Sequence, residues 1–326
     1  MKKKLLYLLP HLSTGGMPQY VLEQIREFKD QFEIFVIEYN LYATKYVVQK
    51  NKIIDLLEPN HHICLSDVSS EIKKDRPEVL EVISNIKPDI VHIQDHVKWF
   101  LTDEIMKGLL NLKNRPYFIV TPHSSQALPD DCIFIPDKYV LVSRWQYELY
   151  KSSTSIPCDI WEYPIKNLKK DKERYQKELN LDPNFYHILN ISIFTRGKNQ
   201  GELFEIARQL KDKPIKFHFI GNQSIHSDYW TPLMENKPEN CIVWGEREDT
   251  DKFYQACDLF YFSTKLELFP LVVRESLSYK LPIMMKKLHT YLDTYDNNEL
   301  VYYIEDNIED NKNKLLNILD IWYMII

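Results

Sequence analysis

Residues 257–282 read CDLFYFSTKLELFPLVVRESLSYKLP and contain one complete strand–helix unit of the fold. The apolar run DLFYFS at 258–263 predicts a buried strand. Proline suits the first turn of a helix, and the residue before it prefers extended backbone. We therefore expect a helix to begin near Phe269–Pro270 and to run through Leu277. The run LPIMM that follows predicts the next strand.

The same alternation of short apolar runs and helical segments extends along the whole chain. In the first half the runs are KLLYLL, FEIFVIE, DIVHIQ, YFIVT and KYVLVS, and in the second half they are YHILNIS, KFHFIG, CIVW, DLFYFS and LPIMM. Continuous apolar strands separated by helices indicate parallel sheets covered on both faces. The predicted fold class is α/β, with each half the size of one doubly wound domain.

The length of 326 residues exceeds that of a single core and predicts two domains. The break is expected in the proline- and lysine-rich stretch YPIKNLKKDKERYQKELNLDPN at 163–184. We predict a first domain at 1–165, a second at 166–305 and a C-terminal helix at 306–326. This apolar last helix either packs on the second domain or crosses back to the first.

Composition excludes several classes of protein. A net charge of −6 argues against a broad nucleic-acid-binding face. Five scattered cysteines without a CxxC pair give neither a zinc framework nor a disulfide scaffold, and fit a reducing cytoplasm. The start MKKKLLYLLPHL imitates a signal peptide, but Pro10 and His11 break its apolar run, so a buried first strand is favoured. No stretch approaches the ~20 apolar residues of a membrane span.

Two strand-to-helix turns carry groups suited to an anion. Gly15 and Gly16 follow the first strand and let the backbone approach a ligand, although a simple tight turn explains them equally well. Neither GxGxxG nor GxxxxGK is present. In the second half, Arg196 and Lys198 flank Gly197 where a strand gives way to a helix. They form either a clamp for a diphosphate or a solvated loop with ordinary surface charges.

Glu267 and Glu275 lie eight positions apart across the predicted helix start. The free amides of Leu271 and Val272 suit a phosphate there, and the two carboxylates can each accept bonds from a different set of hydroxyls. A phosphate between two sugars has this shape. The alternative is a helix-charge interaction for Glu267 and a surface position for Glu275, and the spacing alone does not decide between them.

Six segments taken together resemble a known family. They are GG after the first strand, DIVHIQDH, VTPHSS, VLVSRWQ, RGKNQ and the opening stretch, in this order over residues 5–285. This set is similar to that of the GT-B glycosyltransferases of family GT4, whose EX7E motif matches Glu267 and Glu275. The resemblance implies two Rossmann-like domains that face each other across a cleft, with the acceptor side in the first and the nucleotide-sugar donor side in the second.

The resemblance also implies roles for single residues. Glu267 would contact the donor sugar and Glu275 the nucleotide ribose. Arg196 and Lys198 would neutralise the diphosphate, although the family's arginine usually comes earlier in the loop. His123 would lie near the donor sugar or else be a buried structural histidine. The other implied positions are Gly15, Gly16, Leu268, Phe269, Pro270 and Leu271 at the donor, Gly245 and Glu246 in the WGERE loop near the base, and His96 on the acceptor side.

The implied reaction is transfer of a sugar from a UDP- or GDP-sugar to a hydroxyl of a glycan or lipid-linked acceptor, with retention of configuration. Neither a cofactor nor a metal is expected. The DTD sequence at 249–251 imitates a metal-binding motif, but capping of the following helix by Asp249 or Thr250 is the favoured explanation.

Other interpretations stay open at this point. An epimerase or phosphorylase on the same scaffold would use the same diphosphate clamp, and a catalytically silent partner subunit would keep only the nucleotide-sugar site. The segments MKKK and HVKWFLTDEIMKGLLNLKNR form either a basic, aromatic patch for peripheral membrane contact or a set of surface lysines with core-facing Trp99 and Phe100. The expected location is the cytoplasm, with contact at the inner face of the membrane as the further option.

Overall fold

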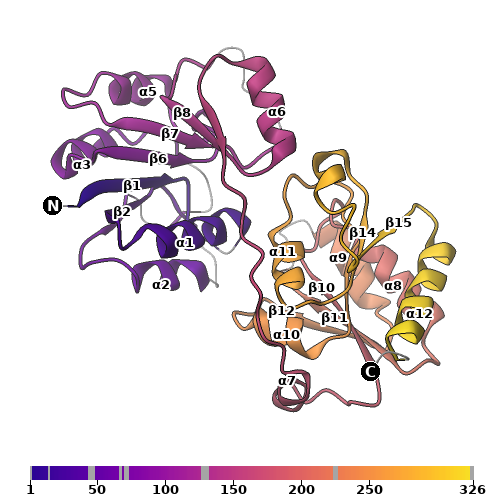
Figure 1. Cartoon of the computed structure of the whole chain (residues 1–326). Coiled ribbons are helices and arrows are strands. Elements are labelled where there is room, and N and C mark those ends of the chain that lie inside the picture. The colour runs from indigo at the N-terminus through magenta and orange to yellow at the C-terminus, as the bar shows by residue number, and fades with distance from the viewer. Residues whose placement is uncertain are drawn as a thin grey trace. The chain divides into compact units, whose positions relative to one another are not determined.

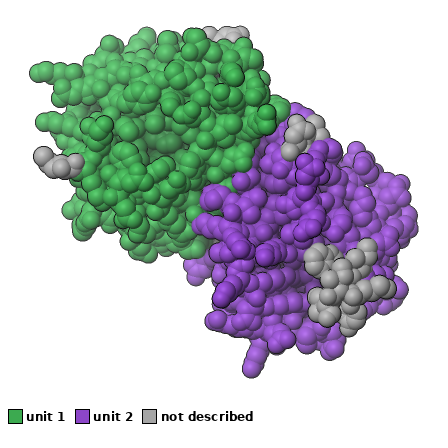
Figure 2. Space-filling view, viewed as in Figure 1, with its two compact units in different colours: residues 1–163 green, residues 164–326 purple. Residues whose placement is uncertain are grey.

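The computed structural model describes residues 2–13, 15–42, 48–65, 68–69, 73–125, 132–222 and 227–323. The chain forms two compact units, residues 1–163 and residues 164–326 (Figure 2). Each unit has its own parallel sheet with helices packed on it (Figure 1). The predicted α/β class with two doubly wound domains is therefore confirmed.

Unit 1 contains a seven-stranded sheet in the order β4-β2-β1-β6-β7-β8-β9. The strands of this sheet are β1 (Lys3–Leu9), β2 (Phe32–Glu38), β4 (His62–Cys64), β6 (Ile90–Gln94), β7 (Tyr117–Thr121), β8 (Lys138–Leu141) and β9 (Cys158–Ile160). A separate two-residue ladder joins β3 (Leu41–Tyr42) and β5 (Val68–Ser69). The helices are α1 (Gly16–Phe28), α2 (Val48–Ile54), α3 (Glu78–Ile86), α4 (Val97–Phe100), α5 (Asp103–Leu110) and α6 (Arg144–Ser153).

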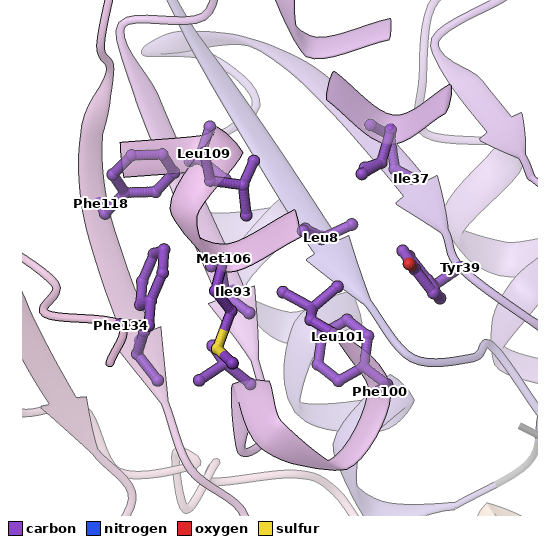
Figure 3. Close-up of a cluster of buried hydrophobic side chains, with 14 of the residues drawn as sticks. Leu8, Ile37, Tyr39, Ile93, Phe100, Leu101, Met106, Leu109, Phe118 and Phe134 are labelled. Atoms are coloured by element: carbon purple, nitrogen blue, oxygen red, sulfur yellow. The ribbon is translucent and has the colours of Figure 1, made fainter. Parts of the chain in front are cut away.

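The first strand shows why these apolar runs form a sheet that is buried on both faces. Successive side chains of a strand point to opposite faces. Leu6 and Leu8 of β1 accordingly lie in one apolar cluster, whereas Tyr7 and Leu9 lie in another. Figure 3 shows the first of these clusters, in which helix residues such as Met106 cover the strands. The start of the chain is thus a core strand, as predicted.

Unit 2 contains a six-stranded parallel sheet in the order β12-β11-β10-β13-β14-β15. Its strands are β10 (Tyr186–Ile191), β11 (Ile215–Ile220), β12 (Cys241–Gly245), β13 (Leu259–Phe262), β14 (Ile283–Lys286) and β15 (Val301–Ile304). Its helices are α7 (Lys172–Glu178), α8 (Gln200–Gln209), α9 (Ser227–Glu235), α10 (Thr250–Ala256), α11 (Leu271–Ser278) and α12 (Ile308–Tyr323), with a 3₁₀ helix η1 (His289–Thr294).

Strand order determines where a ligand binds in such sheets. In unit 2 the chain proceeds outward from β10 to β12 and then returns to place β13 on the other side of β10. In unit 1 the strand order also reverses at the first strand, since β1 lies between β2 and β6. Ligands of doubly wound sheets bind at this switch point, beyond the carboxyl ends of the strands. The loops after β1, β6, β10 and β13 are therefore the positions to inspect.

The last helix packs on unit 2. Leu315, Ile318 and Leu319 of α12 lie in the same apolar cluster as Leu203 and Phe204 of α8. No helix within the described ranges is long and apolar enough to cross a membrane.

Candidate functional site

The start of α11 leaves backbone amides without helical partners. Pro270 precedes the helix in extended conformation, with φ −76° and ψ 104°, and its carbonyl oxygen accepts the amide of Val273 at 3.2 Å. The helix begins at Leu271, within a residue of the predicted start. Its first turn contains no acidic side chain, so the amides of Leu271 and Val272 give this end a positive potential that suits an anion.

Lys198 and Glu267 form an ion pair at the switch point. Lys198 follows β10 and Glu267 follows β13, the two strands that lie side by side there. The lysine side chain is 23% exposed and the glutamate 19%, so water reaches the pair only in part. The second carboxylate oxygen of Glu267 accepts the amide of Leu268 at 3.2 Å. Two predicted site residues are thus brought into direct contact.

Hydrogen bonds join the loops that carry this pair. The amide of Lys265 donates to the carbonyl oxygen of Gly197 at 2.7 Å. The Ser263 hydroxyl is 3.1 Å from the carbonyl oxygen of Lys198 and 2.9 Å from that of Asn199. Thr290 Oγ1 donates to the carbonyl oxygen of Glu267 at 2.6 Å. The backbone on both sides of the ion pair is therefore fixed before any ligand binds.

Glu275 has a different environment from Glu267. It is half-buried on α11, and the hydroxyl of Tyr254 donates to its Oε2 atom at 2.9 Å. Tyr254 belongs to α10 and is almost fully buried, so it holds the carboxylate in place. Sequence reasoning missed Tyr254, because a tyrosine within the run DKFYQAC is indistinguishable from a core residue.

Arg196 lies apart from the ion pair. Its side chain is 72% exposed and donates to Asp228 Oδ2 at 2.7 Å, and its guanidinium carbon lies 5.9 Å from the ring centroid of Tyr229. Both partners belong to α9. The structure thus brings Lys198 to Glu267 but directs Arg196 toward another helix.

Two glycines join the ends of the neighbouring strands β11 and β12. The amide of Gly221 donates to the carbonyl oxygen of Gly245 at 2.9 Å. Gly221 has φ +138°, and an added Cβ there would lie 2.1 Å from the backbone oxygen of Ser192. Glu246, the residue after Gly245, is half-buried, and its Oε1 atom is buried without a hydrogen-bond partner among the described residues. A carboxylate oxygen in this state suits a donor group from a ligand.

The DTD segment has a partner within the protein. Both Asp249 oxygens accept bonds from the Arg247 guanidinium at 2.8 Å, which holds the pKa of Asp249 below its usual range. Asp249 occupies the N-cap position of α10, but its side chain makes no capping bond. The favoured capping explanation therefore fails for Asp249, because the carboxylate is committed to Arg247. No group of three or more metal-binding side chains occurs in the described part of the chain.

In unit 1, the glycine turn leads into α1. Gly15 precedes the helix, and its carbonyl oxygen accepts the amide of Gln19 at 3.2 Å, so that Gly16 is the first helical residue. The loop is anchored by buried Glu38, whose Oε1 accepts the amide of Leu12 at 3.0 Å. Sequence reasoning missed Glu38, which ends the apolar run FEIFVIE.

Glu38 is ionised despite its burial. Burial alone would raise the pKa of this carboxyl, but hydrogen bonds from His62 and Lys50 outweigh that effect and hold the pKa below its usual value. The Lys50 ammonium lies 2.5 Å from Oε2 and His62 Nε2 lies 3.3 Å from it. The carboxylate therefore acts as a fixed anchor for the turn.

His123 is a neutral imidazole. Burial lowers its pKa to about 3, with a smaller contribution from His96. Its Nε2 atom lies 2.9 Å from Gln94 Oε1, which can only accept, so the proton is on Nε2 and Nδ1 is an acceptor. The ring of Tyr20 packs edge-on against it at 5.1 Å.

His96 and Asp95 follow β6 at the same end of the sheet. His96 is buried, and its Nε2 atom lies 3.0 Å from the Ser124 hydroxyl. Asp95 has φ +85°, an uncommon conformation for a non-glycine residue, and burial raises the pKa of its carboxyl. Sequence reasoning selected His96 and overlooked Asp95, because a strained backbone leaves no sequence signal at an aspartate.

Comparison with protein families identifies unit 2. Residues 171–322 match the family model described as Glycosyl transferases group 1. The match covers most of unit 2 and less than half of the chain. The predicted resemblance to a GT4-like group is thereby confirmed for this unit, and the match includes Lys198, Glu267 and Glu275.

Two curated relatives of the chain are named for lipid glycosylation. The chain is 24% identical over 191 residues to a processive diacylglycerol alpha-glucosyltransferase of Acholeplasma laidlawii, and this match covers 56% of each protein. It is 27% identical over 125 residues to an alpha-galactosylglucosyldiacylglycerol synthase of Streptococcus pneumoniae, which covers 36% of this chain and 33% of the relative. The first match thus spans about half of that relative's length, and the second spans a third of the other's.

Solved structures share the fold of this chain over nearly its full length. A glycosyltransferase from Rickettsia africae superposes with a TM-score of 0.76 at 19% identity, over 98% of this chain and 89% of that chain. HepE of Anabaena, in complex with UDP and glucose, superposes with a TM-score of 0.74 at 13% identity, over 97% of this chain and 90% of that chain. The fold is that of the GT-B glycosyltransferases.

Proposed function

We propose that this protein transfers a sugar from a UDP-sugar to a hydroxyl acceptor, with retention of anomeric configuration. The observation that carries the proposal is the Lys198–Glu267 pair at the switch point of unit 2, beside the free amides at the start of α11. Uridine as the base is supported by the UDP complex of a protein with the same fold.

The proposed roles follow from the contacts of each group. The diphosphate would lie between the Lys198 ammonium and the amides of Leu271 and Val272, which are fixed before the reaction and so stabilise the charge that develops on the leaving group. Glu267 would accept bonds from sugar hydroxyls, and Glu275, held by Tyr254, from the ribose hydroxyls. His123 would offer Nδ1 as an acceptor to a hydroxyl group.

In the transfer step, the bond between the anomeric carbon and the diphosphate oxygen breaks while the acceptor oxygen bonds to the same carbon. The acceptor proton moves to the diphosphate oxygen that leaves, on the same face of the sugar. The described residues of unit 2 supply cations and amides for the diphosphate, so we propose turnover without a metal or another cofactor.

We further propose a lipid-linked acceptor at the inner face of the membrane. Both curated relatives are named for glycolipid synthesis. In unit 1, Trp99 is 41% exposed beside Lys98, whereas Phe100 is fully buried. An exposed tryptophan next to a lysine suits the polar–apolar boundary of a bilayer. Cosedimentation with diacylglycerol vesicles tests this contact, and equal binding of a Trp99→Ala variant would contradict it.

The transfer itself is tested by release of UDP from UDP-glucose, with and without diacylglycerol as acceptor. A transferase releases UDP in both cases and faster with acceptor. A silent partner subunit would bind UDP-glucose and release no UDP, whereas an epimerase would change the sugar and keep the nucleotide attached. Absence of a response to UDP-, GDP- and ADP-sugars in a thermal-shift assay would refute the proposal as a whole.

A further inference from the structure

A pocket of about 720 Å³ lies in unit 2 at the carboxyl ends of four neighbouring strands. Asn199 follows β10, Lys265 follows β13, Lys287 follows β14 and Glu305 follows β15, and all four line it. The volume is within the range of about 300–1,000 Å³ that small-molecule sites occupy. Neither Lys198 nor Glu267 lines the pocket, so it is separate from the ion pair.

The charged lining of the pocket is balanced. Three lysines and three carboxylates contribute to its wall, namely Lys265, Lys286, Lys287, Glu202, Glu305 and Asp306. An anionic ligand would meet three carboxylates there, and a cationic ligand would meet three ammonium groups. A neutral ligand whose groups both donate and accept hydrogen bonds fits this wall best, and hydroxyl groups have that property.

The wall around Lys286 is held by contacts within the protein, although the Asp306 carboxylate is itself exposed. Lys286 is 7% exposed and pairs with Asp306, and its ammonium lies 3.6 Å from Glu202 Oε2. Glu202 Oε1 accepts a hydrogen bond from the hydroxyl of Tyr261 at 2.7 Å and another from the side-chain Nδ2 of Asn311 at 3.2 Å. These charges therefore neutralise one another and form a fixed polar surface rather than an ionic binding site.

The outer part of the wall is available to a ligand. Lys265 and Glu305 are exposed, and neither side chain has a hydrogen-bond partner among the residues that the structure describes. Leu288, Ile304 and Ile308 add apolar surface. Donors and acceptors beside an apolar surface suit a sugar ring, which carries hydroxyls at its edge and C–H groups on its face.

The pocket shares its loops with the candidate donor site. Lys265 donates its amide to Gly197, next to Lys198. Leu288 lies two residues before Thr290, whose hydroxyl binds the carbonyl oxygen of Glu267. We propose that this pocket binds a neutral saccharide at a site of its own, beside the candidate donor site.

Binding is tested by calorimetry on the full chain with methyl α-D-glucoside and methyl α-D-galactoside, each with and without saturating UDP. Inorganic phosphate and spermidine serve as the anionic and cationic probes, in the Lys198→Gln variant so that phosphate binding at the donor site is weakened. We expect at least one glycoside to bind, with the same affinity in the presence of UDP, and neither ion to bind in the pocket.

The matched variants separate hydrogen bonding from charge. The double variant Lys265→Ala/Glu305→Ala removes one donor and one acceptor and keeps the net charge, and should weaken glycoside binding by about fivefold or more. The control Lys211→Ala/Glu239→Ala makes the same change at two other exposed positions of unit 2 and should leave the affinity unchanged.

Three results would overturn the assignment: no binding of either glycoside, binding that UDP abolishes, or equal binding by the double variant. Phosphate or spermidine binding that the double variant loses would also overturn it, since the site would then be ionic. None of these outcomes affects the proposed transfer, because UDP release from UDP-glucose is measured separately.

Discussion

The Lys198–Glu267 ion pair predicts that Glu267→Gln binds UDP more tightly than the unchanged protein while it turns over more slowly. In the free protein the lysine is neutralised by the glutamate, so a diphosphate must share the ammonium group and approach a carboxylate. Glutamine has nearly the same shape but no charge, so the substitution removes this competition. The proposed contact to the donor sugar weakens at the same time, because an amide replaces a charged acceptor.

The size of the effect follows from the exposure of the pair. Two unit charges 4 Å apart interact by about 4 kcal/mol at an effective dielectric constant of 20. Both side chains are about one-fifth exposed, and solvent screening and side-chain entropy reduce such values to about 1 kcal/mol. Because 1.4 kcal/mol is tenfold in affinity, we expect Glu267→Gln to lower the Kd for UDP by about fivefold.

Isothermal titration with UDP measures this change, and Glu239→Gln, an exposed glutamate elsewhere in unit 2, is the control. Lys198→Gln should weaken UDP binding, and the double variant should lose the gain that Glu267→Gln shows alone. Unchanged or weaker UDP binding by Glu267→Gln would refute the reasoning, because the glutamate would then not compete with the diphosphate.

Four further predictions concern other parts of the structure. Gly221→Ala should destabilise the protein by more than about 3 kcal/mol in urea unfolding, because its Cβ would meet the Ser192 oxygen at 2.1 Å, and equal stability would contradict this geometry. Tyr254→Phe should weaken UDP binding by up to about tenfold through loss of the bond to Glu275, with little change in fold by circular dichroism. His187 and His218 are buried and their ring nitrogens lie 2.9 Å apart. Burial lowers the pKa of His218 to about 3 and also lowers that of His187, so the unfolded chain binds more protons below pH 6.5. Stability should therefore fall by up to about 1.4 kcal/mol per pH unit for His218 between pH 6.5 and 3, with a further loss from His187 below pH 6.5; a flat profile there would contradict this burial. UDP release should persist in excess EDTA, and its loss with recovery on adding Mn²⁺ would show that a metal is required.

Sequence reasoning predicted the sheets because their strands are buried on both faces and so consist of continuous apolar residues. The helix start after Pro270 was equally accessible, since proline restricts the backbone locally. Short polar strands such as β4 and β9 escaped prediction, because three residues carry too little pattern. Pairing between elements was also out of reach: Lys198 meets Glu267 across 69 positions only because β13 returns to lie beside β10.

The candidate site was predicted unevenly for a related reason. Charged residues at strand-to-helix turns are visible in sequence, which indicates Lys198 and Glu267, and Glu275 follows from its spacing to Glu267 across the helix start. The groups that hold them are ordinary core residues by type, so Tyr254 and Glu38 were missed. The partner of Arg196 is on α9, and no local pattern around either residue indicates that contact.

The Ser263 hydroxyl contacts the carbonyl oxygens of both Lys198 and Asn199, and Lys265 adds a third bond between the same two loops. This arrangement has a consequence for protein engineering. Exchange of either loop alone would disturb these contacts, together with the Thr264–Gly197 hydrogen bond and the Lys198–Glu267 ion pair, and would shift the backbone of the other loop. The two segments form a single transplantable module, and a chimera with altered donor preference requires residues 192–199 and 263–270 to be taken together from one parent.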